Sequence, residues 1–318
     1  MINLEFCNKY GEEERREIVH EFADLNLRNR KKVDDLDAWC EDYLGKIDSK
    51  FKSYRAVVEA TPDELERIKD SLDKKTYIQL ITDKLYDDVI DDDGNRIMES
   101  PGSLYKKRGN SYVIDTLYKN MRPEAKKLLL KMLDTRVCPY CNRNYVFSRE
   151  YVTTCQLDHF YSKSRYTILA ASFYNLIPCC STCNMKKKDA IFKINPHDTS
   201  NKTDDILRFS YDISNADYLV NSDSIDVKAE SLDSRYADQL SVLELNDIYK
   251  MHNIDVHDVL VKRKIFSEQY IDMLRHAFPG VFQTTTSVEE LLYGITLIDN
   301  EMGKRPLTKL IRDVMKQI

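Results

Sequence analysis

The sequence lacks long apolar runs, internal repeats and low-complexity tracts. No stretch of its 318 residues reaches the eighteen or more apolar residues that a membrane-spanning helix needs. The first residues show no basic segment followed by an apolar one, so we expect no secretion signal and no membrane partner. With 42% hydrophobic residues, the chain can still bury a substantial core. These absences predict a folded protein in the cytoplasm.

The chain also lacks an overall positive charge, but its basic residues are unevenly distributed. The formal net charge of −5 argues, taken alone, against a nucleic-acid partner. Between Arg136 and Lys193, however, nine Lys and Arg residues stand against three Asp and Glu residues. A local positive region of this kind can attract phosphate groups even when the whole chain is acidic. The same stretch contains the closely spaced cysteines.

The cysteines are too few for a disulfide scaffold in a chain of this length, but four of them form two CxxC pairs. Cys138 and Cys141 make one pair, and Cys180 and Cys183 make the other. Two such pairs, brought together by folding, are typical of a tetrahedral zinc site with four thiolate ligands. We assign Cys179 no metal, because its spacing from Cys183 fits a tight turn less well. The alternative is that these residues are unliganded core cysteines.

Hydrophobic spacing favours an α+β protein that is predominantly α-helical. Residues 1–134 are expected to form a helical N-terminal region, and residues 196–318 a C-terminal region of short strands followed by helices. Helical periodicity is clear at Leu65, Ile68 and Leu72, and again between 78 and 89, before a polar loop at 91–103. Short β-rich runs between 207 and 232 predict a hairpin.

Three further features of the sequence mark helices. Thr61 to Glu64 and Ser287 to Glu290 both have the pattern of a capping box, which predicts a helix start at each place. A helix is also expected at 122–133. The last helix has an apolar face and a basic face that we expect to be solvated, with Lys304, Arg305, Lys309, Arg312 and Lys316 on the basic side.

Residues 135–195 are expected to form a small zinc-stabilised module between the two helical regions. Alternation predicts a strand over 151–158, which ends with Asp158 and His159, and a second strand over 175–177. A helix is expected to start near Cys183, so that Asn184 faces back toward His159. Strand, loop, strand and helix, held by four cysteines, make a ββα unit.

The polar residues of this module resemble the HNH nucleases of the His-Me finger group. The similarity rests on Asp158-His159, on Asn175, and on the second CxxC pair followed directly by Asn184 with Lys187 beyond. More loosely, LDHFYSKS, NLIPCCSTCN and RPLTKL resemble the nuclease subunit of Septu-type anti-phage systems. That likeness implies an effector that works beside an ATPase partner.

Phosphodiester hydrolysis assigns a role to each of these residues. A neutral imidazole such as that of His159 can take a proton from the attacking water. Asp158 and the amide oxygen of Asn184 are hard oxygen ligands that suit a catalytic Mg²⁺ or Mn²⁺. The family resemblance implies that Asn175 orients the loop after His159. One departure is that many family members have histidine where Asn184 stands.

Basic residues lie next to this proposed centre. Lys163 and Arg165 follow His159, while Lys186, Lys187 and Lys188 follow Asn184. Phosphate binding would explain such a set, because basic side chains that neutralise phosphates release counterions and position the backbone. The alternative is an ordinary solvated helix face. We expect DNA rather than RNA as the nucleic acid.

Two other functions use the same features differently. A zinc module with a basic helix could bind nucleic acid without cutting it, and it would need the cysteines and lysines but not Asp158 or His159. A nuclease fold could also serve only as the scaffold of an assembly subunit. The presence of all four residues Asp158, His159, Asn175 and Asn184 favours the metal-dependent endonuclease.

Overall fold

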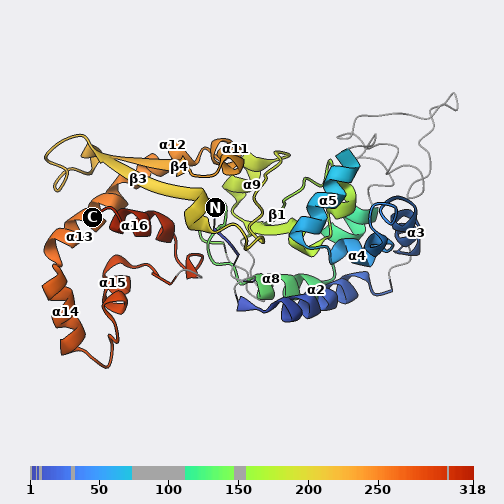
Figure 1. The fold of residues 1–318 in the computed structure, drawn as a ribbon, viewed down its shortest axis with the longest axis horizontal. Coiled ribbons are helices and arrows are strands. Elements are labelled where there is room, and N and C mark those ends of the chain that lie inside the picture. Colours follow the sequence, from blue (N-terminus) through green and yellow to red (C-terminus); the bar gives the residue numbers. More distant parts are fainter. Residues whose placement is uncertain are drawn as a thin grey trace.

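The computed structural model describes residues 2–4, 6, 9–29, 33–73, 112–146, 155–298 and 301–318. These residues form mostly helices together with two antiparallel two-stranded sheets, β1–β2 and β3–β4. The architecture agrees with the predicted α+β class. The N-terminal helices gather at one end of the molecule and the C-terminal elements at the other, with β1 and α9 between them (Figure 1).

The first part of the described chain is helical. Its elements are α2 (Glu12–Leu27), α3 (Val33–Tyr43), η1 (Ser49–Phe51), α4 (Tyr54–Val58), α5 (Pro62–Asp73), the π-helical segment η2 (Tyr112–Lys119) and α8 (Pro123–Leu133). The predicted apolar face of α5 is buried, and the Glu64 carboxylate accepts the Thr61 backbone N–H at 2.9 Å, as expected of that helix start. The periodicity at 78–89 and the loop at 91–103 lie outside the described residues.

The middle part contains the ββα unit. Strands β1 (Gln156–His159) and β2 (Leu176–Cys179) pair with His159 opposite Leu176, and the connection between them holds η3 (Thr167–Leu169) and η4 (Phe173–Asn175). Helix α9 (Ser181–Lys187) follows directly. The first strand was expected over 151–158; residues 151–154 lie outside the described residues, and β1 begins at Gln156. Two other expected boundaries were wrong. Asn175 precedes the second strand, and α9 begins at Ser181 because Cys180 acts as its N-cap.

The last part combines a hairpin with helices. Its elements are α10 (Thr203–Ile206), β3 (Leu207–Ile213), η5 (Ser222–Ser224), β4 (Ile225–Ser231), α11 (Ser234–Val242), α12 (Leu245–Tyr249), η6 (Lys250–His252), α13 (Asn253–Ile265), α14 (Glu268–Ala277), α15 (Thr285–Tyr293) and α16 (Thr308–Met315). Strands β3 and β4 form the predicted hairpin. No helix among the described residues is long and apolar enough to cross a membrane.

The predicted start of the helix near residue 287 was wrong. Helix α15 begins at Thr285, and Thr284 is its N-cap, with its side chain accepting the Ser287 backbone N–H at 3.1 Å. Ser287 therefore closes the capping box as its third helical residue. The Glu290 carboxylate instead accepts the Leu297 backbone N–H at 2.7 Å, beyond the end of the helix. A serine can take the role of the usual glutamate, so the start lies three residues earlier than the common pattern indicates.

The basic face of the last helix is not fully solvated. Lys309 is 2% exposed, and its ammonium lies 2.6 Å from a carboxylate oxygen of Asp313 and 2.8 Å from one of Asp204. Arg312 is also buried. Helix α16 packs on β3, where Asp313 accepts the Phe209 backbone N–H at 2.8 Å. The neighbouring strand thus covers a face that the sequence pattern alone marks as exposed.

Asn142 joins the first cysteine pair to the C-terminal region. It is buried and has a positive φ of 49°. Its side chain accepts the Lys309 backbone N–H at 3.0 Å and donates to the Met302 carbonyl at 3.1 Å, while its own carbonyl accepts the Leu307 N–H at 2.7 Å. The turn that carries Cys141 is therefore fixed directly to the start of α16.

We predict that Asn142→Ala destabilises the protein by about 2 kcal/mol, because buried groups of the C-terminal region lose their partners. Asn142→Gly loses the same side-chain bonds but tolerates the positive φ, so it should be about 1 kcal/mol more stable than the alanine variant. Urea unfolding of both variants, each with its metal content matched to the wild type, measures the two differences. Wild-type stability in Asn142→Ala would contradict this account.

Candidate catalytic site and cysteine cluster

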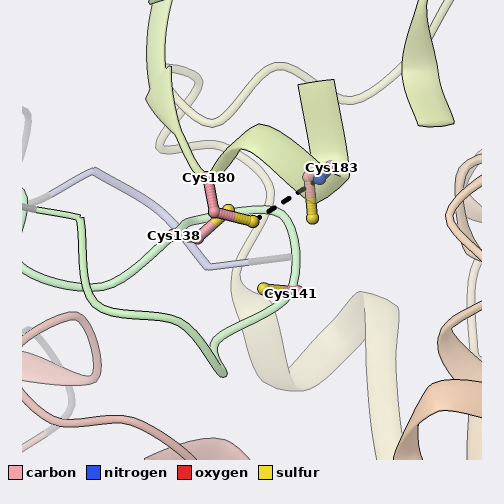
Figure 2. A group of neighbouring side chains, drawn as sticks. All are labelled: Cys138, Cys141, Cys180 and Cys183. Atoms are coloured by element: carbon pink, nitrogen blue, oxygen red, sulfur yellow. Dashed lines mark hydrogen bonds between the residues drawn. The ribbon is translucent and has the colours of Figure 1, made fainter. Parts of the chain in front are cut away.

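Four cysteine sulfurs converge from two parts of the chain. Cys138 and Cys141 lie on the turn after α8, while Cys180 and Cys183 lie at the start of α9 (Figure 2). All four are buried, and their sulfur atoms lie within 4.8 Å of one another. Ligands about 2.3 Å from a tetrahedral zinc would be about 3.8 Å apart, so the sulfurs need only small shifts to reach that geometry. The arrangement could hold a zinc ion.

Backbone and amide donors surround this cluster. The Cys183 backbone N–H donates to the Cys180 sulfur at 3.5 Å, and the Asn144 side-chain amide donates to the same sulfur at 3.4 Å. Such donors favour a thiolate, which is the form that binds metal. Cys179, which we assigned no metal, is not among the four converging cysteines; it is buried in β2, and burial raises the pKa of its thiol.

Asp158 is buried and held on two sides. The Tyr140 hydroxyl donates to its Oδ2 atom at 2.7 Å, and the Lys187 ammonium lies 3.1 Å from the same oxygen. Lys187 also donates to the His159 carbonyl at 2.7 Å. Burial raises the pKa of the Asp158 carboxyl, while Lys187 and Tyr140 oppose that rise. Because one ammonium offsets its charge, Asp158 can stay ionised in a buried position.

The position of Lys187 differs from the phosphate-binding role that we predicted for it. Its side chain is 0% exposed, and its ammonium also lies 5.4 Å from the centre of the Phe192 ring. An ammonium enclosed in this way faces Asp158 rather than solvent. Lys187 therefore belongs to the internal support of the site.

His159 ends β1 with its imidazole in a fixed orientation. The Nε2 atom lies 3.1 Å from the Ala170 carbonyl oxygen, an acceptor that requires the proton to be on Nε2. Nδ1 is then the unprotonated nitrogen, and it has no hydrogen-bond partner among the residues that the structure describes. Burial, with a smaller effect from Lys163, lowers the pKa of His159 to about 3. The imidazole is therefore neutral at neutral pH, and Nδ1 is the nitrogen that carries its free lone pair.

Asn175 supports the loop after His159 from within. The side chain is fully buried, and its oxygen accepts the Tyr161 backbone N–H at 2.7 Å. Its amide group donates to the carbonyls of Tyr161 and Leu169, at 3.1 and 2.9 Å. The loop that these bonds secure includes Ala170, the partner of His159. The contacts of Asn175 are those of a residue that orients the imidazole indirectly.

Five of the predicted site residues, Asp158, His159, Lys163, Asn184 and Lys188, line one hollow of about 490 Å³. Its lining residues are Tyr118, Gln156, Leu157, Asp158, His159, Ser162, Lys163, Asn184, Lys188 and Asp189. Asn184 donates its amide N–H to the Gln156 side-chain oxygen at 2.6 Å, so its oxygen is the atom that a cation would use. Asp158, His159 and Asn184 thus share one surface, as the sequence predicted.

The predicted basic residues divide into two groups. Lys163 and Lys188 line the hollow, and burial lowers the pKa of Lys163. Arg165 instead pairs with Asp73 at 3.0 Å, and Lys186 pairs with Glu244. Arg165 and Lys186 are thus partly neutralised by carboxylates from regions distant in sequence.

The hollow also contains residues that sequence reasoning missed. Asp189 accepts hydrogen bonds from the Ser162 and Ser164 hydroxyls, which lower the pKa of its carboxyl. Its position just after the lysine run was the signal that could have identified it. Gln156 and Tyr118 carry no motif, and only the fold brings them to the site.

Comparison with known protein families identifies the same part of the chain as the candidate functional site. Residues 138–190 match the family described as HNH endonuclease. Searches of curated proteins and of solved structures give no match. The matched stretch includes both cysteine pairs, Asp158, His159, Asn175 and Asn184. The chain therefore contains an HNH endonuclease domain at residues 138–190, which indicates a nuclease.

Proposed function

We propose that this protein is a metal-dependent endonuclease that hydrolyses phosphodiester bonds in DNA. One observation carries the proposal: a neutral imidazole with its Nδ1 atom unpaired among the described residues lines the same hollow as the oxygen ligands Asp158 and Asn184. A general base beside a cation site is the combination that phosphodiester hydrolysis needs. A module that only binds nucleic acid does not require a general base beside a cation site.

The residues around His159 have separate tasks in this reaction. Nδ1 takes a proton from water, while the bond from Nε2 to the Ala170 carbonyl keeps the ring in the required tautomer. Lys187 and Tyr140 hold Asp158 ionised and fix its position. Asp158 and Asn184 would bind Mg²⁺ or Mn²⁺, and a single carboxylate beside one amide suits a cation that retains several waters. The bound ion would act as a Lewis acid toward the phosphate and the leaving oxygen.

The cysteine cluster has a structural task in the same proposal. The soft donor set of four thiolates favours zinc over magnesium. A closed set of four protein ligands leaves no open position for substrate, so this ion would serve stability and not the reaction. Its effect on activity would pass through α9, which has Cys180 as its N-cap, Cys183 in its first turn, and Asn184 as the next residue.

The biological setting that we propose rests on the sequence resemblance. The likeness to the Septu-type nuclease subunit supports a role as a defence effector in the cytoplasm, with an ATPase partner. Partial neutralisation of Arg165 and Lys186 fits a chain that needs a partner for firm substrate binding. A nuclease with low activity alone would also protect the host cell.

We predict that the purified protein nicks plasmid DNA with Mg²⁺ or Mn²⁺, and that His159→Ala lowers the rate by about 10²–10⁴-fold through loss of the base. His276→Ala is the matched control, because that histidine is exposed on α14 and should retain wild-type activity. DNA affinity is measured in parallel in Ca²⁺. If the wild type binds DNA but neither it nor the partner-supplemented protein cuts, the binding-only function is correct.

The neighbouring cysteines Cys179 and Cys180 provide a direct test of the zinc site. Elemental analysis should find about one zinc per chain in the wild type and in Cys179→Ser, but a large loss in Cys180→Ser. Chelation of the wild type should lower its thermal midpoint, because the metal connects the turn after α8 to α9. Equal zinc contents in the two serine variants would remove Cys180 from the ligand set.

Substitution of individual lysines should distinguish those that contact phosphate from one that is paired with a carboxylate of the protein. We expect Lys188→Ala and Lys163→Ala each to weaken DNA binding severalfold. Each should also make the slope of log Kobs against log salt concentration less negative by about one. Lys186→Ala, which removes an ammonium already paired with Glu244, should change the slope little. Fluorescence anisotropy over a salt series in Ca²⁺ measures this. A larger effect for Lys186 than for Lys188 would contradict the assignment.

A further inference from the structure

Tyr118 reaches the hollow from outside the stretch that matches the HNH family. It lies near the end of η2, whereas the match begins at residue 138. Its ring centre is 4.3 Å from that of the His159 imidazole, with an angle of 66° between the planes. This edge-to-face contact brings a large flat group against the proposed base.

We propose that Tyr118 is a positioning residue for His159, and that η2 is therefore part of the active site. The inference rests on the proposed function of His159 as the base. Its consequence is that residues 138–190 do not form a complete site by themselves. The aromatic ring, rather than the hydroxyl group, is the part of Tyr118 that touches the imidazole.

The geometry explains why a second restraint on His159 is needed. The single hydrogen bond from Nε2 to the Ala170 carbonyl fixes one edge of the imidazole. One hydrogen bond still permits the ring to tilt about that contact. The Tyr118 ring packs on the imidazole as a second restraint, so the direction of Nδ1 is defined by two contacts from different segments. Small errors in such an orientation are costly, because proton transfer requires a near-linear approach.

Tyr118 is itself well placed to act as a fixed support. Its hydroxyl donates to the Leu157 carbonyl at 3.1 Å, which connects it to the strand that carries Asp158 and His159. Val113, Ile114 and Leu117 on the same segment are buried in the core. π-Helical turns occur often at functional sites, where they redirect a side chain. The ring therefore lies on a segment that is packed into the core and hydrogen-bonded to strand β1.

The same ring also contacts Lys163. The Lys163 ammonium lies 5.1 Å from the Tyr118 ring centre, a distance typical of a cation–π contact. Lys163 lines the hollow beside His159. One aromatic ring thus holds two groups of the site, the proposed base and a proposed phosphate contact.

Two substitutions separate the ring from the hydroxyl. Tyr118→Phe keeps the ring and should retain kcat within about threefold, since ring packing supplies the contact with His159. Tyr118→Leu removes the ring and should lower kcat about 10–100-fold, a loss expected when a catalytic group is misplaced. We expect the Km for DNA to change severalfold at most, through Lys163. Zinc content and thermal midpoint identify any variant that is misfolded.

A spectroscopic measurement tests the contact without relying on activity. In protein labelled with ¹⁵N-histidine, His159 should show a single Nε2–H tautomer in the wild type and in Tyr118→Phe. Tyr118→Leu should give a broadened or shifted His159 ring signal, because the imidazole can then tilt about its bond to the Ala170 carbonyl, which still sets the tautomer. If Tyr118→Leu keeps both the wild-type kcat and the wild-type position and width of the His159 ring signal, Tyr118 does not position His159. If the phenylalanine and leucine variants are equally impaired, the contribution of Tyr118 comes from its hydroxyl bond to Leu157, and the proposed role of ring packing is wrong.

This design distinguishes the failure of the inference from the failure of the proposed function. If the wild-type protein cuts no DNA under any condition, the nuclease proposal fails, but the position and width of the His159 ring signal still decide whether Tyr118 orients the imidazole. If the wild type cuts and His159→Ala does not, a normal rate in Tyr118→Leu overturns only the role of Tyr118.

Discussion

The convergence of four cysteine sulfurs determines where the proposed catalytic residues can lie. Cys180 caps α9 and Cys183 lies in its first turn, so the helix begins at the cluster. The next residue after Cys183 is Asn184, which the helix therefore directs into the hollow. The opposite turn carries Tyr140, which holds Asp158, and Asn142, which secures the start of α16. Loss of the cysteine cluster would thus disturb both the proposed cation ligands, Asp158 and Asn184, and the packing of the C-terminal region.

A buried ion pair fixes the other end of the same helix. Lys187 is the last residue of α9, and it meets Asp158 on β1 with both side chains almost inaccessible. Removal of one partner from such a pair typically costs about 3–5 kcal/mol, because the other charge is left buried alone. With sulfur contacts at its first turn and this pair at its last, α9 has little freedom to move. Asn184, between the two restraints, is held more firmly than its partial exposure suggests.

The sequence predicted those parts of the site that depend on local spacing. Two CxxC pairs, a ββα order and the residues Asp158, His159 and Asn184 all follow from patterns within a short stretch, and the structure brings them together. The unpredicted features depend on contacts between distant segments. Nothing near Arg165 indicates its pairing with Asp73, and nothing near residue 118 indicates a ring on His159. The exposed or buried state of a basic side chain follows from the tertiary structure, so a run of three lysines could not reveal that its middle member is internal.

The charges of the hollow indicate how a phosphate could be attracted to it. Two carboxylates, Asp158 and Asp189, and two ammonium groups, Lys163 and Lys188, line the surface, and the imidazole of His159 is neutral. Lys187 lies behind Asp158, 3.1 Å from its carboxylate, so three ammonium groups stand against two carboxylates and the protein groups alone leave a small net positive charge. A divalent cation on Asp158 and Asn184 would make the hollow more strongly positive beside the proposed base. Substrate binding and catalysis would then both depend on the ion, while Lys163 and Lys188 would attract the phosphate backbone and fix its position.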